Sequence, residues 1–293
     1  MGFPSFQGTN RDQVQHWVAQ SEILFAAWQH FVGPWHQLLR KGSPIHVVLA
    51  RLVANQLETL RSICAMAEGG HFASTQVLVR KMYETWLVLL SLTADIDPKY
   101  RRRDLAKAFI YHSEIRTVEI LDWQRREGAP ELPSKHELSL ARRKARTRMR
   151  FFLRMRPGLL KNYNSKPSGR LQAKTIRDWH PFGGTKGLRD KVIAAVQASS
   201  IPDSIGMNDP DLWRHLHNLA WHGASDYVHP SWIGVQALDQ LDTQDLSLEL
   251  SARHDPNLFL AAFAIATISV DILAHELVQT DSWTKYVEDA TAG

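Results

Sequence analysis

The chain has 293 residues, of which 44% are hydrophobic, and this is enough apolar content to bury a substantial core. Disorder is therefore excluded as the main state of the chain. The formal charge of +5 is mild but uneven, because residues 135–177 hold 14 Lys and Arg side chains and a single acid, Glu137. A segment this basic indicates an anionic partner, either in another molecule or elsewhere in the chain.

Two features of the sequence indicate the cellular compartment of the protein. The single cysteine, Cys64, cannot form an internal disulfide, and the first residues lack the basic and apolar regions of a signal peptide. The longest apolar run, Leu258–Val270, is shorter than the roughly 20 residues that cross a bilayer, so we expect a buried core helix there. The expected protein is cytoplasmic and has no membrane partner.

Apolar residues recur at helical spacing, and strand-like alternation is nearly absent. The pattern predicts an all-α fold with helices at about 10–31, 44–67, 72–94, 98–126, 135–155, 187–198, 210–228 and 256–280. A capping residue followed by proline marks four helix starts: Ser43-Pro44, Asp97-Pro98, Asp209-Pro210 and Asp255-Pro256. Ser134 with Glu137 predicts a capping box at a fifth start.

These helices are expected to form one bundle-like domain over residues 1–293. Residues 1–42 are predicted as an N-terminal helix extension, 43–281 as the core and 282–293 as a tail. The prolines and glycines of residues 157–186 predict a long irregular connection. The stretch "LSLEL" at 246–250 is the one place that favours a short strand.

The helix predicted at 210–228 has its polar residues on a narrow arc of the helical wheel. At about 100° per residue the arc contains Arg214, Asn218, His222, Ser225 and His229. Histidine, serine and asparagine in the absence of Glu and Lys favour a partly buried polar groove. The alternative is that the arc is simply the solvent-facing side of an amphipathic helix.

A second set of charged residues lies near the helix predicted at 72–94, which is apolar almost all round. Arg80 and Glu84 are four residues apart on one face of that helix. They form either a structural salt bridge or an anion-binding site with Arg80 at its floor. Arg103, in the first turns of the next helix, opposes the helix dipole and is expected to have an anionic partner, such as a ligand phosphate.

The helix predicted at 135–155 contains most of the basic residues. Its candidate phosphate contacts are Arg142, Arg143, Lys144, Arg146, Arg150 and Arg154. Binding through such residues is expected to depend strongly on salt. The alternative is a helix whose cations are solvated or paired with acids elsewhere in the chain.

Three features of the sequence resemble those of a family of helical bacterial proteins whose domain has no known function. They are Arg80-x-x-x-Glu84 on an apolar helix, the Trp179 segment followed by "GGTKGLRDK", and Ser225-x-Tyr227-Val228-His229-Pro230-Ser231. The resemblance covers about residues 50–235. It implies an all-helical fold with a polar site shared by the Arg/Glu helix and the His-Pro-Ser turn.

Arg214-His215 with His222 is also similar to the signature of the HEPN group, which are helical ribonucleases that need no metal. Seven residues separate Arg214 from His222, a longer spacing than in that group. The similarity implies that Arg214 stabilises a charged phosphorane while His222 moves the proton of the ribose 2′-OH.

The resulting hypothesis is a metal-independent ribonuclease or RNA-binding protein of defence or toxin type. Its ligand is expected to be RNA or another phosphate-bearing molecule. A homodimer is one of the oligomeric states considered. The predicted catalytic residues are Arg214, His222, His229 and Ser225. The predicted ligand-binding residues are Arg80, Glu84, Asn218, Tyr227 and Arg103.

Other chemistries are less well supported by the sequence. On a helix His215 and His217 diverge by about 200° and no paired carboxylates accompany them, so neither a metal nor a cofactor is expected. Cys64 lies in an apolar helical stripe and is read as a packing residue. The alternative function is a non-enzymatic helical protein that binds a ligand or partner, in which Arg80, Glu84 and the histidines form a structural network.

Overall fold

The computed structural model describes residues 10–41, 43–68, 72–94, 96–97, 99–128, 132–156, 159, 180, 182, 184–198, 210–223, 256–277, 282–283 and 285. Within these ranges the regular structure is helical and no strand is found, which confirms the predicted all-α class. The stretch at 246–250 and most of the irregular connection at 157–186 lie outside the described residues.

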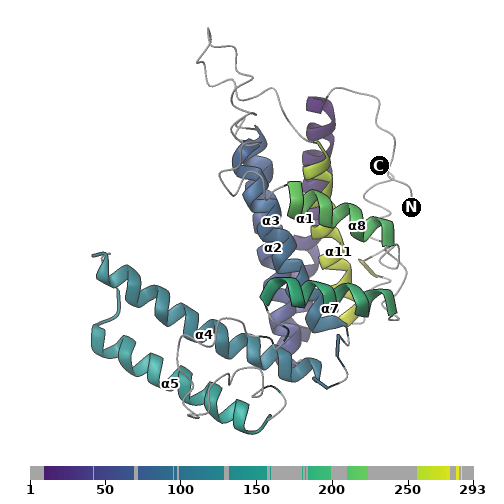
Figure 1. Cartoon of the computed structure of the whole chain (residues 1–293). Coiled ribbons are helices and arrows are strands. Elements are labelled where there is room, and N and C mark those ends of the chain that lie inside the picture. The colour runs from purple at the N-terminus through teal and green to yellow at the C-terminus, as the bar shows by residue number, and fades with distance from the viewer. Residues whose placement is uncertain are drawn as a thin grey trace. The chain divides into compact units, whose positions relative to one another are not determined.

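The helices follow one another along the chain in Figure 1. They are α1 (Asn10–Lys41), α2 (Pro44–Glu68), α3 (Phe72–Thr93), α4 (Arg102–Arg126), α5 (Lys135–Arg154), α7 (Gly184–Ala198), α8 (Pro210–His217) and α11 (Pro256–Glu276). A π-helical turn, η2 (Asn218–Gly223), continues α8. The predicted bounds of α2, α3 and α5 are confirmed to within one residue.

Helix α4 starts later than its capping signal predicted. Asp97 closes a turn instead, because its carboxylate accepts the backbone N–H of Lys99 at 3.0 Å and its carbonyl accepts that of Tyr100 at 2.9 Å. The residue at the N-cap is Arg101, which has an extended backbone and makes no side-chain cap. The Asp-Pro signal therefore marks the turn before α4, and the predicted start at residue 98 is wrong.

Other helix ends show how local signals succeed or fail. The capping box of α5 is confirmed: Glu137 accepts the backbone N–H of Ser134 at 2.7 Å, and the Ser134 hydroxyl accepts that of Glu137 at 3.2 Å. Helix α1 continues through Pro34, well past its predicted end at residue 31. Helix α7 begins at Gly184, three residues before its predicted start.

The chain divides into two compact units. Unit 1 comprises Met1–Thr93 and Val196–Gly293, and unit 2 comprises Ala94–Ala195. Unit 1 is thus built from two separate stretches of chain, and unit 2 from one continuous stretch. The prediction of one domain over residues 1–293 stays a prediction.

Helix α11 lies at the centre of unit 1, where it packs against α1, α2, α3 and η2. Helix α3 also contributes to this core, and Tyr83, Trp86 and Leu90 on it are completely buried. Within the described residues one helical stretch, Asn257–Glu276, has the length and composition to cross a membrane, with a mean hydropathy of 2.0, and 67% of it is buried inside the protein. Its burial among four other elements is that of the core helix expected from the sequence.

The start and the end of the chain also contribute to the unit 1 core. Trp283, in the predicted tail, is 2% exposed, and its ring centroid lies 5.7 Å from that of Phe31 and 6.3 Å from that of Trp35, both on α1. Its indole N–H donates to the carboxylate of Asp271 on α11. Burial raises the pKa of Asp271 to about 6, although the hydrogen bond from Trp283 opposes the shift.

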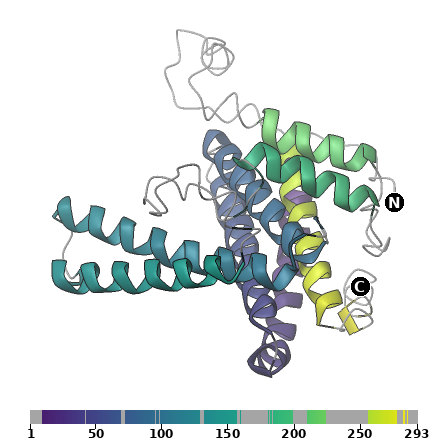
Figure 2. The ribbon, with the colours of Figure 1, turned by 60° about the horizontal axis from the view of Figure 1, so that its bottom comes forward.

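Unit 2 contains an antiparallel hairpin of α4 and α5, which lie side by side in both ribbon views (Figures 1 and 2). Its seam is apolar, with Ile115 and Val118 of α4 and Leu138, Ala145 and Met149 of α5 buried. The start of α7 is fixed by close packing, since a Cβ added to Gly187 would lie 1.7 Å from the backbone oxygen of Phe182.

Candidate functional site

A cluster of ring and charged side chains lies where α3 contacts η2. The hydroxyl of Tyr83 on α3 lies 2.9 Å from Nδ1 of His217, the last residue of α8. Tyr83 is completely buried and His217 is partly exposed. Because a phenol hydroxyl can both donate and accept, it can pair with this nitrogen in either protonation state of the imidazole.

Arg80 and Trp221 complete this group. The Arg80 guanidinium lies over the Trp221 ring, 4.5 Å from its centroid, and the Arg80 Nε lies 3.4 Å from Oε1 of Glu84. The Trp221 ring is stacked on the imidazole of His217 at 6.4 Å and tilted towards Tyr83 at 6.2 Å. We call these five residues, Arg80, Tyr83, Glu84, His217 and Trp221, the α3–η2 cluster.

The predicted Arg80–Glu84 pair is therefore confirmed as a contact. The Arg80 side chain is 18% exposed and that of Glu84 is 45% exposed, so the pair lies at the edge of the core rather than inside it. The guanidinium lies over the face of Trp221 within cation–π distance, and such contacts involve Arg more often than Lys.

The backbone changes its helical form within this cluster. The helix changes from α to π directly after His217, and in a π-helix the hydrogen bonds span five residues rather than four. Side chains beyond Asn218 therefore leave the positions that an α-helical wheel assigns to them. Single π turns of this kind occur frequently at functional sites.

Two residues of the predicted polar arc can be described, Arg214 on α8 and Asn218 at the start of η2, and both are exposed, as the solvent-facing alternative described. The Arg214 side chain is 69% exposed and forms an ion pair of 2.9 Å with Asp211, one turn earlier. His215 and Asn218 are exposed as well. The helix packs through its apolar side, where Leu216 and Ala220 are buried, and this leaves the polar side in solvent.

The remaining catalytic candidates are not placed by the structure. His222 belongs to η2, but its side chain lies outside the described part of the chain, and so do Ser225, Tyr227 and His229. Arg103 is exposed on α4 in unit 2, whereas Arg80 and Glu84 belong to unit 1. The assignment of these residues to one site stays a prediction.

Sequence reasoning missed three members of the α3–η2 cluster. Tyr83 follows Arg80 by three residues, so a helical wheel places both on one face of α3, but Tyr83 was not among the predicted site residues. His217 and Trp221 lay off the predicted polar arc. Their contacts with Tyr83 and Arg80 join positions far apart in the chain, which no local sequence rule announces.

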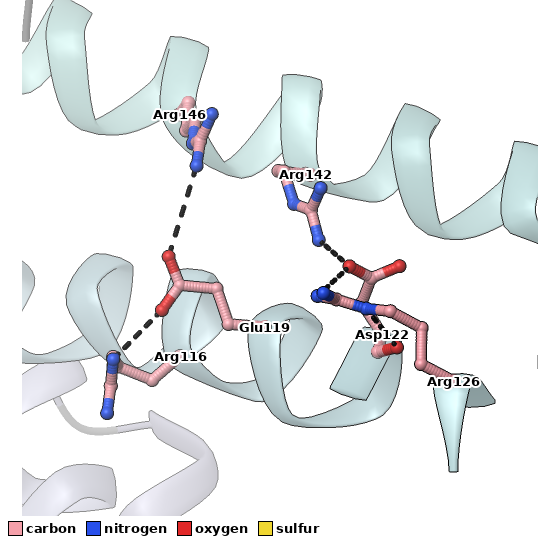
Figure 3. Close-up of polar contacts among 6 residues, drawn as sticks. All are labelled: Arg116, Glu119, Asp122, Arg126, Arg142 and Arg146. Carbon is pink, nitrogen blue, oxygen red and sulfur yellow. Dashed lines mark hydrogen bonds and ion pairs between the residues drawn. The ribbon is translucent and has the colours of Figure 1, made fainter. Parts of the chain in front are cut away.

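The hairpin of unit 2 shows where part of its basic charge is neutralised (Figure 3). Asp122 of α4 accepts hydrogen bonds from Arg126 at 2.8 Å and from Arg142 of α5 at 2.7 Å. Glu119 pairs with Arg116 at 2.9 Å and with Arg146 at 3.9 Å. The hydrogen bond from Arg142 is the main reason that the pKa of Asp122 is lowered.

The six predicted phosphate contacts therefore divide into two groups. Arg142 and Arg146 face α4 and are paired with its acids, as the acid-paired alternative described. The other four are exposed, and no ion pair is found for them among the described residues; they are Arg143, Lys144, Arg150 and Arg154. We call these four the outward cations of α5.

In the ranges that the structure describes, no group of three or more His, Cys, Asp or Glu side chains is arranged to hold a metal ion. Cys64 is buried on α2, as its place in an apolar stripe predicted.

These features define an all-helical protein with an arginine–aromatic–histidine cluster in one unit and a basic hairpin in the other. The chain belongs to DUF5677, a family of unknown function, whose sequence pattern matches residues 46–245. The match confirms the predicted membership of an uncharacterised domain family. No curated protein sequence and no solved structure gives a significant match.

Proposed function

We propose that this protein binds RNA through the outward cations of α5. The observation that carries the proposal is the division of charge on this helix. Arg142 and Arg146 are paired with acids of α4, while the outward cations have no acidic partner among the described residues. Exposed cations along one side of a helix suit a phosphate backbone, whose neutralisation releases bound counterions.

The proposal predicts the salt dependence of binding. Four phosphate contacts on a single strand give a slope of log affinity against log salt of roughly −3. A triple variant, Arg143→Gln, Arg150→Gln and Arg154→Gln, is expected to weaken binding and to reduce this slope by roughly 2. Fluorescence anisotropy with a labelled RNA, measured at several salt concentrations, gives both quantities.

A matched control separates the α5 surface from general positive charge. Arg116→Gln, Arg126→Gln and Arg148→Gln remove the same number of charges, but all three arginines are paired with acids. We expect this control to bind RNA nearly as the parent protein does. Equal weakening of both triple variants, or no binding by the parent protein, would reject the proposal.

We extend the proposal to metal-independent cleavage of the bound RNA, with Arg214, His222, His229 and Ser225 as the catalytic residues. The similarity to the HEPN signature supports it, together with the suitability of histidine for proton transfer near neutral pH. His217 joins these candidates because it is partly exposed and its imidazole stacks on Trp221, the ring over which Arg80 also lies.

The test is incubation with total RNA in EDTA, read on a denaturing gel. Cleavage that persists in the chelator and is lost in Arg214→Ala, or in a double variant with His222→Ala and His229→Ala, is the expected result. Loss in His217→Ala instead would move the catalytic site to the α3–η2 cluster. Full activity in all of these variants would remove the catalytic assignment.

A second candidate is a non-enzymatic helical binding protein with a structural Arg/Glu/His network. It is favoured by the Tyr83–His217 hydrogen bond, which joins α3 to the end of α8 across the fold of unit 1. RNA that is bound but remains intact would select this function. Under both proposals the protein acts in the cytoplasm, and light scattering with and without RNA tests whether it is a homodimer.

A further inference from the structure

The surface of α5 that carries the outward cations also exposes large apolar side chains. Phe151 is 67% exposed, and Leu140 and Met155 are each 59% exposed. The next residue, Phe152, is 8% exposed and belongs to the hairpin seam, where its ring lies 5.5 Å from that of Tyr111. Phe152 therefore packs in the hairpin, whereas most of Phe151 faces solvent.

The spacing along α5 places Phe151 between two of these cations. Lys144 precedes it by seven residues and Arg154 follows it by three, and both spacings keep the side chains on one side of a helix. The rise of an α-helix separates the three positions by about 10 Å and about 5 Å. An exposed aromatic ring thus lies in a row with cations on each side of it.

We propose that α5 binds single-stranded RNA, with an unpaired base stacked on Phe151 and the neighbouring phosphates on the outward cations. This inference rests on the proposed function and adds the form of the RNA to it. Bases in a duplex present only their edges in the grooves, whereas a single strand offers the face of each base to an aromatic side chain. Cations alone would not distinguish these two forms, because both carry phosphates.

The experiment compares single-stranded oligo(U) with a blunt RNA duplex on the full-length protein. Phe151→Ala is expected to lower the affinity for oligo(U) about tenfold, the usual scale of one lost stacking contact, and to leave duplex affinity unchanged. Phe151→Tyr keeps the ring and should bind as the parent protein does. Leu140→Ala, an equally exposed apolar residue without a ring, serves as the control and should have no effect.

The failures of the two proposals are distinguishable. One contrary result is that Phe151→Ala has no effect on the affinity for either RNA form, and another is that it has an equal effect on both, while the triple variant of Arg143, Arg150 and Arg154 still binds more weakly than the parent. Either result overturns the stacking inference and leaves the proposal of RNA binding in place. If the triple variant binds RNA normally, the proposed function fails. Binding to vesicles containing phosphatidylserine that disappears in Phe151→Ala, with RNA binding unchanged, would assign the surface to a membrane and overturn the inference.

Discussion

The protonation of Asp271 affects the free energy of unfolding. This carboxyl group is largely buried on α11 and accepts the indole N–H of Trp283, which anchors the C-terminal segment against α1. Desolvation raises its pKa from 3.8 to about 6, so the folded protein holds this proton more tightly than the unfolded chain does. Its contribution to stability is therefore present below about pH 4 and is lost as the pH rises through 6.

Asp271→Asn should remove this pH dependence. The amide oxygen still accepts the Trp283 N–H, and no charge has to be buried. Relative to the parent, the variant is expected to be similar in stability near pH 4 and more stable by about 3 kcal/mol at pH 7, from roughly two units of pKa shift. Thermal unfolding of both proteins at several pH values measures the difference, and a difference that stays constant with pH would contradict the raised pKa.

Two glycines differ in the room that they leave for an added side chain. At Gly187 a Cβ would lie 1.7 Å from the backbone oxygen of Phe182, so Gly187→Ala must displace backbone and should cost about 1–3 kcal/mol or more. At Gly33, inside α1, no atom beyond its chain neighbours and its own helix backbone lies within 4 Å of the added carbon, but Pro34 follows and disfavours the helical conformation of a residue with a Cβ, so Gly33→Ala should not give the usual gain of about 0.5–1 kcal/mol. Gly187→Ala should lower the thermal midpoint by more than Gly33→Ala does, and an unchanged midpoint in Gly187→Ala would show that the Gly187 contact is not tight.

At the scale of the element, the α4–α5 hairpin combines an apolar seam with ion pairs along its edge. Asp122 has one arginine partner on its own helix and one on the other helix (Figure 3). Its pKa is lowered, so the stability it contributes is present above its ordinary pKa and is lost as acid protonates it. The contact to α5 is the one that joins the two helices.

The two arginines at Asp122 therefore differ in their effects. Arg142→Gln removes the link between helices and should speed amide hydrogen exchange in α4 and α5, whereas Arg126→Gln removes only a contact within α4 and should change exchange little. In the parent protein, the protection factors of the hairpin amides, which are corrected for the intrinsic pH dependence of exchange, should also fall on acidification below pH 4. Equal exchange in the two variants would mean that Asp122 does not hold the helices together.

The elements were predictable where local chemistry decides them. The capping box at Ser134 was predicted correctly because its two residues are neighbours in sequence, and the starts of α2, α8 and α11 were predicted correctly because proline fits the first helical position. The start of α4 was misplaced because Asp97 has the residues of a cap but closes a turn. The Arg80–Glu84 pair was predicted from a helical wheel, because the two residues are only four positions apart on one helix.

The α3–η2 cluster was less predictable, because it joins residues more than a hundred positions apart. The Tyr83–His217 hydrogen bond spans 134 positions, and a wheel drawn on either helix alone does not show it. The change to a π turn at Asn218 also invalidates the α-helical angles on which the predicted arc depended. The acid pairing of α5 was recognised as an alternative, but which arginines take part depends on the register of the hairpin.

At the scale of the whole molecule, the two units differ in the interactions that stabilise each of them internally. Unit 1 depends on the burial of α3 and α11, and the hairpin of unit 2 adds exposed ion pairs to its seam. Salt screens exposed ion pairs and does not weaken apolar burial. The two units should therefore respond differently to ionic strength.

Hydrogen exchange at low and high salt tests this difference. In 1 M NaCl we expect faster exchange in α4 and α5 and unchanged or slower exchange in α3 and α11. The effect should be small, because individual exposed pairs contribute less than about 1 kcal/mol. The same change in all four helices would show that the ion pairs do not stabilise the hairpin selectively.

The division of unit 1 between two stretches of chain has a consequence for its synthesis. Helices α1, α2 and α3 leave the ribosome first, but α11, which packs against all three, follows only after the whole of unit 2. At about 5–20 residues per second, the chain from Thr93 to Pro256 takes roughly 10 to 30 s to make. During that interval the faces of α2 and α3 that pack against α11 lack this helix, so we expect them to stay exposed until α11 is made.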